Sequence, residues 1–201
     1  MENVVVSIFD IESEAFQAFS ELKQFGQTEN TNLAQASIVK AENGVVNVKD
    51  SFDLMDSLGD DYFEGGLIGS LIGILGGPLG VLFGFAAGGA IGASVGSDKE
   101  LANSVLITTV SNKLTNGEVA IIALVQENDE SVLNSIFEKY QVHIARWDVA
   151  TVAAEIESAL KIQKDLEHQA KARLIADKKE ARREKFDKLK ANIKEKFSKK
   201  N

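Results

Sequence analysis

Residues 65–97 read GGLIGSLIGILGGPLGVLFGFAAGGAIGASVGS, and none of them is charged, although about a third of the residues outside this stretch are. The stretch contains 12 of the chain's 16 glycines. In water, each glycine costs a helix roughly 1 kcal/mol relative to alanine, so helices this rich in glycine need tight packing to offset the penalty. We therefore expect the stretch to pack closely, either in lipid or against another protein surface.

The glycines recur every four residues in two series. The first series is Gly65, Gly69, Gly73 and Gly77, and the second is Gly76, Gly80, Gly84, Gly88, Gly92 and Gly96. Residues four apart lie almost above one another on a helix, so each series predicts a groove without side chains. Two helix backbones can approach closely along such a groove, as they do in membrane helix pairs. We therefore expect these glycines to mediate helix packing or oligomerisation.

The only proline in the chain divides the stretch into two arms. Pro78 follows Gly76 and Gly77, and it cannot continue a helix without the loss of a hydrogen bond. These three residues predict a turn between helical arms over residues 64–77 and 79–96. At a rise of about 1.5 Å per residue, the arms are about 20 and 27 Å long, so the first is too short to cross a hydrocarbon core of about 30 Å.

The flanks favour a hairpin over a single membrane crossing. One crossing would put the two flanking halves on opposite sides of a bilayer, and neither half has enough strands and helices for a stable core of its own. Acidic residues border the stretch, without the excess of Lys and Arg that is typical of a cytoplasmic membrane entry. We therefore expect the stretch to return both halves to the same aqueous side.

The half before the stretch has the order strand, helix, strand, strand. The predicted ranges are 3–9 for the first strand, 11–25 for the helix, and 36–41 and 45–49 for the two later strands. Asp10 is the predicted N-cap of the helix, and Gly26 is its predicted stop. Asn43 and Gly44 join the last two strands, because this pair tolerates the positive φ angles of a tight hairpin.

The half after the stretch repeats the order strand, helix, strand. A strand is predicted over residues 118–126, a helix capped by Asn128 or Asp129 runs to about residue 140, and a strand follows over 142–148. The sequence therefore predicts an α+β fold of the ferredoxin-like kind, with one sheet, helices on one face and the glycine hairpin between two βαβ units. The expected segments are 1–50, 51–97, 98–148 and a long charged helix over 149–201.

Charge divides the chain more sharply than its net charge of −8 suggests. Residues 161–201 carry 15 Lys and Arg against 7 Asp and Glu, so this tail is at about +8 and residues 1–160 are at about −16. The end of the tail has the pattern of an interfacial helix, with apolar residues at helical spacing among cations. The predicted lipid-facing residues are Arg182, Arg183, Lys185, Phe186, Leu189, Lys190, Ile193, Lys194 and Phe197. A solvated helix, or a helix that packs on another subunit, explains the same pattern equally well.

The order of parts resembles a bacterial family described as predicted membrane proteins of unknown function. The resemblance covers residues 3–150, and its most specific part is the glycine block GGLIG…GGPLG. The chain is also similar, more distantly, to bacterial general-stress proteins. The resemblance implies membrane association and a stress context, and it brings no catalytic residues.

No motif for catalysis or for cofactor binding fits its required context. Residues 92–96 match G-x-S-x-G, but they belong to the expected glycine helix and not to a strand-turn-helix elbow. The sequence has neither a dinucleotide-binding glycine motif nor a phosphate loop, and it lacks cysteine. His143 and His168 have no second ligand at metal spacing, and the acidic body disfavours nucleic acid. We therefore expect no catalytic, cofactor or metal site and no small-molecule substrate.

These observations predict a non-enzymatic, membrane-associated oligomeric scaffold with a role in envelope stress. It would self-associate through the glycine hairpin, which would lie in or on lipid, and its basic helix would lie on the membrane surface. Because the first residues lack the pattern of a secretory signal, we expect it at the cytoplasmic face of the membrane. The alternatives are a soluble homo-oligomer whose hairpins pack as a core between subunits, and a pore-forming assembly.

Overall fold

The computed structural model describes residues 1–25, 30–43, 45–54, 66–77, 80, 105–114 and 117–198. The chain forms two compact units, Met1–Leu160 and Lys161–Asn201. The elements of the first unit, in chain order, are β1 (Glu2–Phe9), α1 (Glu12–Gln24), β2 (Thr31–Glu42), β3 (Val45–Asp53), α2 (Leu67–Gly76), α4 (Val105–Lys113), β4 (Val119–Glu127), α5 (Glu130–Phe137) and β5 (Val142–Asp148). The last helix, α6 (Val149–Ser198), begins in the first unit and makes up most of the second.

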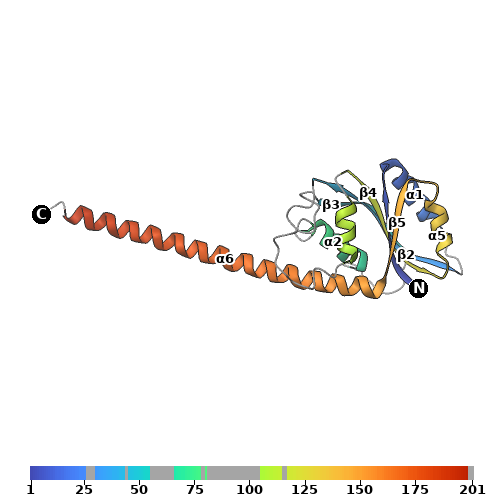
Figure 1. Cartoon of the computed structure of the whole chain (residues 1–201). Helices are drawn as coiled ribbons and strands as arrows, with labels where there is room; N and C mark the ends of the chain where they lie inside the picture. Colours follow the sequence, from blue (N-terminus) through green and yellow to red (C-terminus); the bar gives the residue numbers. More distant parts are fainter. Residues whose placement is uncertain are drawn as a thin grey trace. The chain divides into compact units, whose positions relative to one another are not determined.

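The described strands form one antiparallel sheet in the order β3-β2-β4-β1-β5 (Figure 1). Both β1 and β2 pair antiparallel with β4, which lies between them, so β1 and β2 are parallel to each other. In the same way β1 lies between β4 and β5. Because α1 connects β1 to β2 and α5 connects β4 to β5, each helix joins two parallel strands across an intervening one. The predicted α+β class is confirmed.

One face of the sheet is covered by α1 and α5. Val5 and Phe9 of β1 alternate along this face, and they belong to a core with Phe19 of α1 and Phe137 of α5. The rings of Phe9 and Phe137 meet edge to face, with centroids 6.0 Å apart. The two-residue period of the strands and the helical spacing of α1 and α5 therefore bring these residues together in one layer.

The opposite face of the sheet, here called the second face, is also buried, and the helices that cover it form a second layer. Val4, Val6 and Ile8 of β1 point away from α1 and α5, yet none is more than 6% exposed. The buried helical residues on this side are Ile68, Leu71, Ile72, Ile74 and Leu75 of α2, Leu106, Ile107 and Val110 of α4, and Val152, Ile156 and Ala159 of α6. Figure 1 shows α2 on the side of the sheet away from α1 and α5. The prediction of helices on one face was wrong, because β1 and β4 are apolar on both faces and need cover on both.

The ends of the helices agree only in part with the sequence predictions. Asp129 caps α5 as predicted, since its carboxylate accepts a hydrogen bond of 2.9 Å from the Ser131 amide. The prediction for Asp10 was wrong: the N-cap of α1 is Ile11, whose carbonyl accepts from the Glu14 and Ala15 amides, so Asp10 lies one residue too early. Asn43 has the expected positive φ, 55°. Gly26 and Gly44 lie outside the described residues.

A buried carboxylate links the helices of the second layer. Glu155 of α6 is 7% exposed, and its carboxylate accepts hydrogen bonds of 3.1–3.3 Å from the Leu106 and Ile107 amides at the start of α4. These amides have no partner within α4 itself, and the positive end of a helix favours a negative charge. Glu155 therefore attaches α4 to α6.

We expect Glu155→Ala to lower the free energy of unfolding by about 1–2 kcal/mol, the range for loss of a helix cap, because the α4 amides would be left buried without an acceptor. Urea denaturation of the full chain followed by circular dichroism measures this change. Glu157→Ala is the control, because Glu157 is exposed on the same helix. Equal stability of the two variants would contradict the role given to Glu155.

Candidate functional site

The glycines of α2 have two different environments. Gly69 and Gly73 are exposed, and a methyl group added to either would meet no described atom within 4 Å. They lie on the side of α2 away from its buried residues, among them Leu71 and Leu75. Since alanine would fit at both positions and would favour the helix, the packing of the described residues does not require glycine there.

The glycines at the end of α2 are required by close backbone contacts. A methyl group at Gly76 would come within 2.8 Å of the Val46 carbonyl oxygen of β3, and one at Gly77 within 2.8 Å of the Gly73 carbonyl oxygen. A methyl group at Gly80 would overlap the Leu75 carbonyl. These three glycines therefore serve the packing of α2 within the chain.

The remaining residues of the predicted hairpin are not described. The helix α2 ends at Gly76, and the Gly77 amide donates to the Ile74 carbonyl at 3.3 Å. Gly65, Pro78, Gly84, Gly88, Gly92 and Gly96 lie outside the described residues. The reversal at Pro78 and the second arm therefore remain predictions. Among the described helices, none combines the length and the apolar character needed to span a bilayer.

The second unit presents the predicted lipid-facing segment on α6. Arg182, Arg183, Lys185, Phe186 and Lys190 have exposed side chains, and the ammonium of Lys190 lies 5.0 Å from the centre of the Phe186 ring. Leu189, Ile193, Lys194 and Phe197 are in the same helix, but their side chains lie outside the described part. We call residues 171–198 of α6 the distal segment.

Apolar side chains are exposed along the distal segment. Ile175 is 67% exposed and Phe186 is 57% exposed. These two residues are about three turns apart, so they lie on nearly the same side of the helix. Leu189, Ile193 and Phe197 continue from Phe186 at spacings of three and four residues. Every described side chain from Lys171 to Phe186 is exposed, so no described residue covers this side of the helix.

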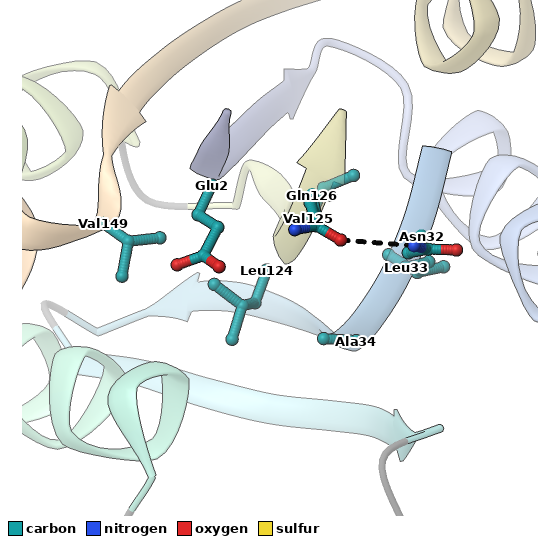
Figure 2. Close-up of a pocket in the computed structure, with 8 residues that line it drawn as sticks. All are labelled: Glu2, Asn32, Leu33, Ala34, Leu124, Val125, Gln126 and Val149. Carbon is teal, nitrogen blue, oxygen red and sulfur yellow. Dashed lines mark hydrogen bonds between the residues drawn. The ribbon is translucent and has the colours of Figure 1, made fainter. Parts of the chain in front are cut away.

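A cavity of about 380 Å³ lies on the second face of the sheet, and Figure 2 shows its lining residues. It lies where β1 begins and β4 ends, beside the first residue of α6. Its lining residues are Glu2, Asn32, Leu33, Ala34, Leu124, Val125, Gln126 and Val149. The sequence alone does not predict this cavity, because its residues become neighbours only through the cross-strand register of β1, β4 and β2.

The most buried ion pair among the described residues is structural. The Glu127 side chain is 1% exposed, and its Oε1 accepts from Nε of Arg146 at 2.7 Å and from Nδ2 of Asn3 at 3.1 Å. Arg146 Nη2 also donates to Oδ1 of Asn134 at 2.6 Å. These groups bind one another, so the cluster connects β1, β4, β5 and α5.

A second polar cluster joins α1 to the end of α5. Oε2 of Glu21 accepts from the Lys139 ammonium at 2.7 Å, and Oε1 accepts from the Tyr140 hydroxyl at 2.8 Å. The hydrogen bonds from Lys139 and then Tyr140 lower the pKa of the Glu21 carboxyl. Burial, followed by the hydrogen bond to the Glu21 carboxylate, raises the pKa of Tyr140 to about 12.

The two histidines of the sequence lie on different elements. His143 is exposed on β5, and His168 is exposed on α6. Across the ranges that the structure describes, no three His, Asp or Glu side chains gather as metal ligands would. The G-x-S-x-G residues 92–96 lie outside those ranges.

A family model described as protein of unknown function (DUF1269) matches residues 63–163, which is half of the chain. No match was found among curated proteins or among solved structures. The matched range includes α2, α4, β4, α5, β5 and the first part of α6. It therefore covers the described elements of the second helical layer, whereas the distal segment lies beyond it.

We expect Tyr140 to ionise about two pH units above an ordinary tyrosine. In a Tyr62→Phe variant, Tyr140 is the only tyrosine, and absorbance at 295 nm should titrate with a midpoint of about 12. Because this pKa is raised by folding, the contribution of Tyr140 to stability is full below about pH 10 and is lost as the pH rises toward 12. A midpoint near 10 would contradict the burial and hydrogen bonding of this hydroxyl.

Proposed function

The chain belongs to the DUF1269 family, whose function is unknown, and we propose that it is a non-enzymatic, membrane-associated scaffold. Its distal segment would lie on a surface rich in anionic lipid, such as the cytoplasmic face of a membrane. The resemblance to general-stress proteins adds an envelope-stress context to the proposal.

The observation that carries this proposal is the exposure of cations and apolar side chains together along the distal segment. Arg182, Arg183 and Lys185 are exposed within four residues of the exposed Phe186, and the Lys190 ammonium lies over the Phe186 ring. An interfacial helix needs both features: apolar side chains enter the boundary of the acyl chains, and each cation near an anionic surface contributes about 1 kcal/mol. A solvated helix would need no exposed Phe186 or Ile175.

The burial of the apolar side of α2 argues against a lipid contact on this side of the helix. Ile68, Leu71 and Leu75 are fully buried within the chain, so this side of α2 has no apolar surface left for acyl chains. The same argument favours α6 as the attachment, since its distal apolar side chains are exposed. In this proposal, the first arm of the predicted hairpin belongs to the folded first unit, which lies in water.

A second function, self-association, is favoured by the glycine side of α2. Gly69 and Gly73 leave an exposed strip without side chains, and no described atom would meet a methyl group there. Each glycine costs a helix roughly 1 kcal/mol relative to alanine. A strip of glycines offsets this cost where it lets the backbone of another helix approach closely. The proposed partner is the same strip of a second copy.

We also propose that the first unit is related in fold to ferredoxin-like domains. It is supported by the strand order β5-β1-β4-β2 with α1 and α5 as connections, to which β3 adds an edge strand. In this interpretation α2 and α4 are an insertion that covers the second face of the sheet.

We expect the full chain to co-sediment with phosphatidylcholine vesicles that contain phosphatidylserine. Replacement of Arg182, Arg183 and Lys185 by Gln removes about 3 kcal/mol of attraction and should weaken binding about 100-fold. Phe186→Ser should also weaken binding, because an apolar group would be lost from the interface.

The control is a charge-matched variant with Gln at Lys113, Lys161 and Lys164, which are exposed and lie outside the distal segment. It should lose clearly less binding than the distal triple variant. Equal losses in the two variants would mean that net charge alone attracts the chain, and no binding by the unmodified chain would contradict the proposal.

For self-association, we expect Gly73→Leu to shift the chain from an oligomer to a monomer in sedimentation velocity. The thermal unfolding midpoint should not fall, because no described atom would meet a methyl group at Gly73 and leucine favours the helix over glycine. A monomeric unmodified chain at high protein concentration, or an oligomer that persists in Gly73→Leu, would contradict this role of α2.

A further inference from the structure

The cavity on the second face of the sheet has an apolar floor. Leu124 of β4 and Ala34 of β2 line it, and Val149 lines it at the start of α6 (Figure 2). The register of β2 with β4 passes from Leu33 directly to Gln35, so Ala34 sits in a bulge without a partner on β4. A bulge bends a strand locally, which helps to open space beside the sheet.

The rim of the cavity is polar and carries one charge. Glu2, Gln126 and Asn32 stand side by side on β1, β4 and β2, because Gln126 is the cross-strand partner of both other residues. Nδ2 of Asn32 donates to Oε1 of Gln126 at 3.2 Å. The lining residues include no cation, and Figure 2 shows the Glu2 carboxylate directed toward the space between Val149 and Leu124.

We propose that this cavity binds a small organic cation, a primary ammonium on a short alkyl stem. The Glu2 carboxylate would accept hydrogen bonds from the ammonium, and the stem would lie on Leu124, Ala34 and Val149. A carboxylate at the mouth of a mostly apolar cavity is a usual arrangement for recognition of one charged end of a ligand. A volume of about 380 Å³ is at the lower end of the range for small-molecule sites, which restricts the ligand to few atoms.

The charge of the first unit favours a cation over an anion. Residues 1–160 are at about −16, so the field around the unit attracts ammonium ions and repels carboxylates and phosphates. At the cavity itself, Glu2 is the single charged lining residue. A neutral alcohol could use the apolar floor but would not gain from the carboxylate.

The test is a titration of the ¹⁵N-labelled full chain with n-butylammonium chloride at constant ionic strength, followed by amide chemical shifts. The amides of Glu2, Ala34 and Leu124 should shift together, with a dissociation constant on the order of a few millimolar. The matched probes are 1-butanol, which keeps the stem without the charge, and sodium butyrate, which reverses the charge. Both should bind at least about fivefold more weakly.

Two variants separate the carboxylate from the floor. Glu2→Gln should weaken n-butylammonium binding about fivefold or more while it leaves 1-butanol unaffected, and Ala34→Leu should fill the floor and weaken both probes. Amide spectra of the variants without ligand establish that each remains folded. The inference is overturned if n-butylammonium shifts none of these amides at tens of millimolar, if 1-butanol binds as tightly, or if Glu2→Gln binds the ammonium unchanged.

Discussion

The burial of both faces of one sheet is the constraint on which the first unit depends. β1 has Val5 and Phe9 on one face and Val4, Val6 and Ile8 on the other, and all are buried. A strand that is apolar on both sides cannot lie at a water surface, so two helical layers are needed. The helices α1 and α5 supply the first, and α2, α4 and the start of α6 supply the second. The glycine-rich helix α2 is therefore a core element that places its apolar side against the sheet.

Because α2 packs on the sheet, the two units present different kinds of surface to other partners. The buried leucine and isoleucine side chains of α2 face the sheet, whereas Gly69 and Gly73 are exposed among the described residues. In the second unit the situation is reversed: α6 exposes Ile175 and Phe186 among cations. Charge follows the same division, with the acidic body at about −16 and the tail at about +8. An anionic membrane would attract the tail and repel the body, which suits a helix on the lipid and a folded unit held in water.

Local patterns predicted most elements, and contacts that are distant in sequence account for the failures. The β-branched runs predicted β1, β4 and β5, and the absence of Pro and Gly predicted the length of α6. The helix α4 was missed, because its Val, Ile and Thr residues do not favour a helix and its packing on α2 and α6 decides its structure. Glycine spacing identified α2 but could not separate Gly76 and Gly80, which pack inside the chain, from Gly69 and Gly73. The cavity and the Glu127–Arg146 pair depend on cross-strand register, which the sequence alone does not specify.

Hydrogen exchange of the α2 backbone amides in the full chain tests most directly whether the glycine-rich helix is part of the aqueous core. The burial of Ile68, Leu71 and Leu75 predicts slow exchange of residues 67–76 in water without lipid. Addition of vesicles that contain phosphatidylserine should leave this exchange unchanged while it slows exchange in the distal segment of α6. Rapid exchange of α2 in water, with protection only after vesicles are added, would contradict the account.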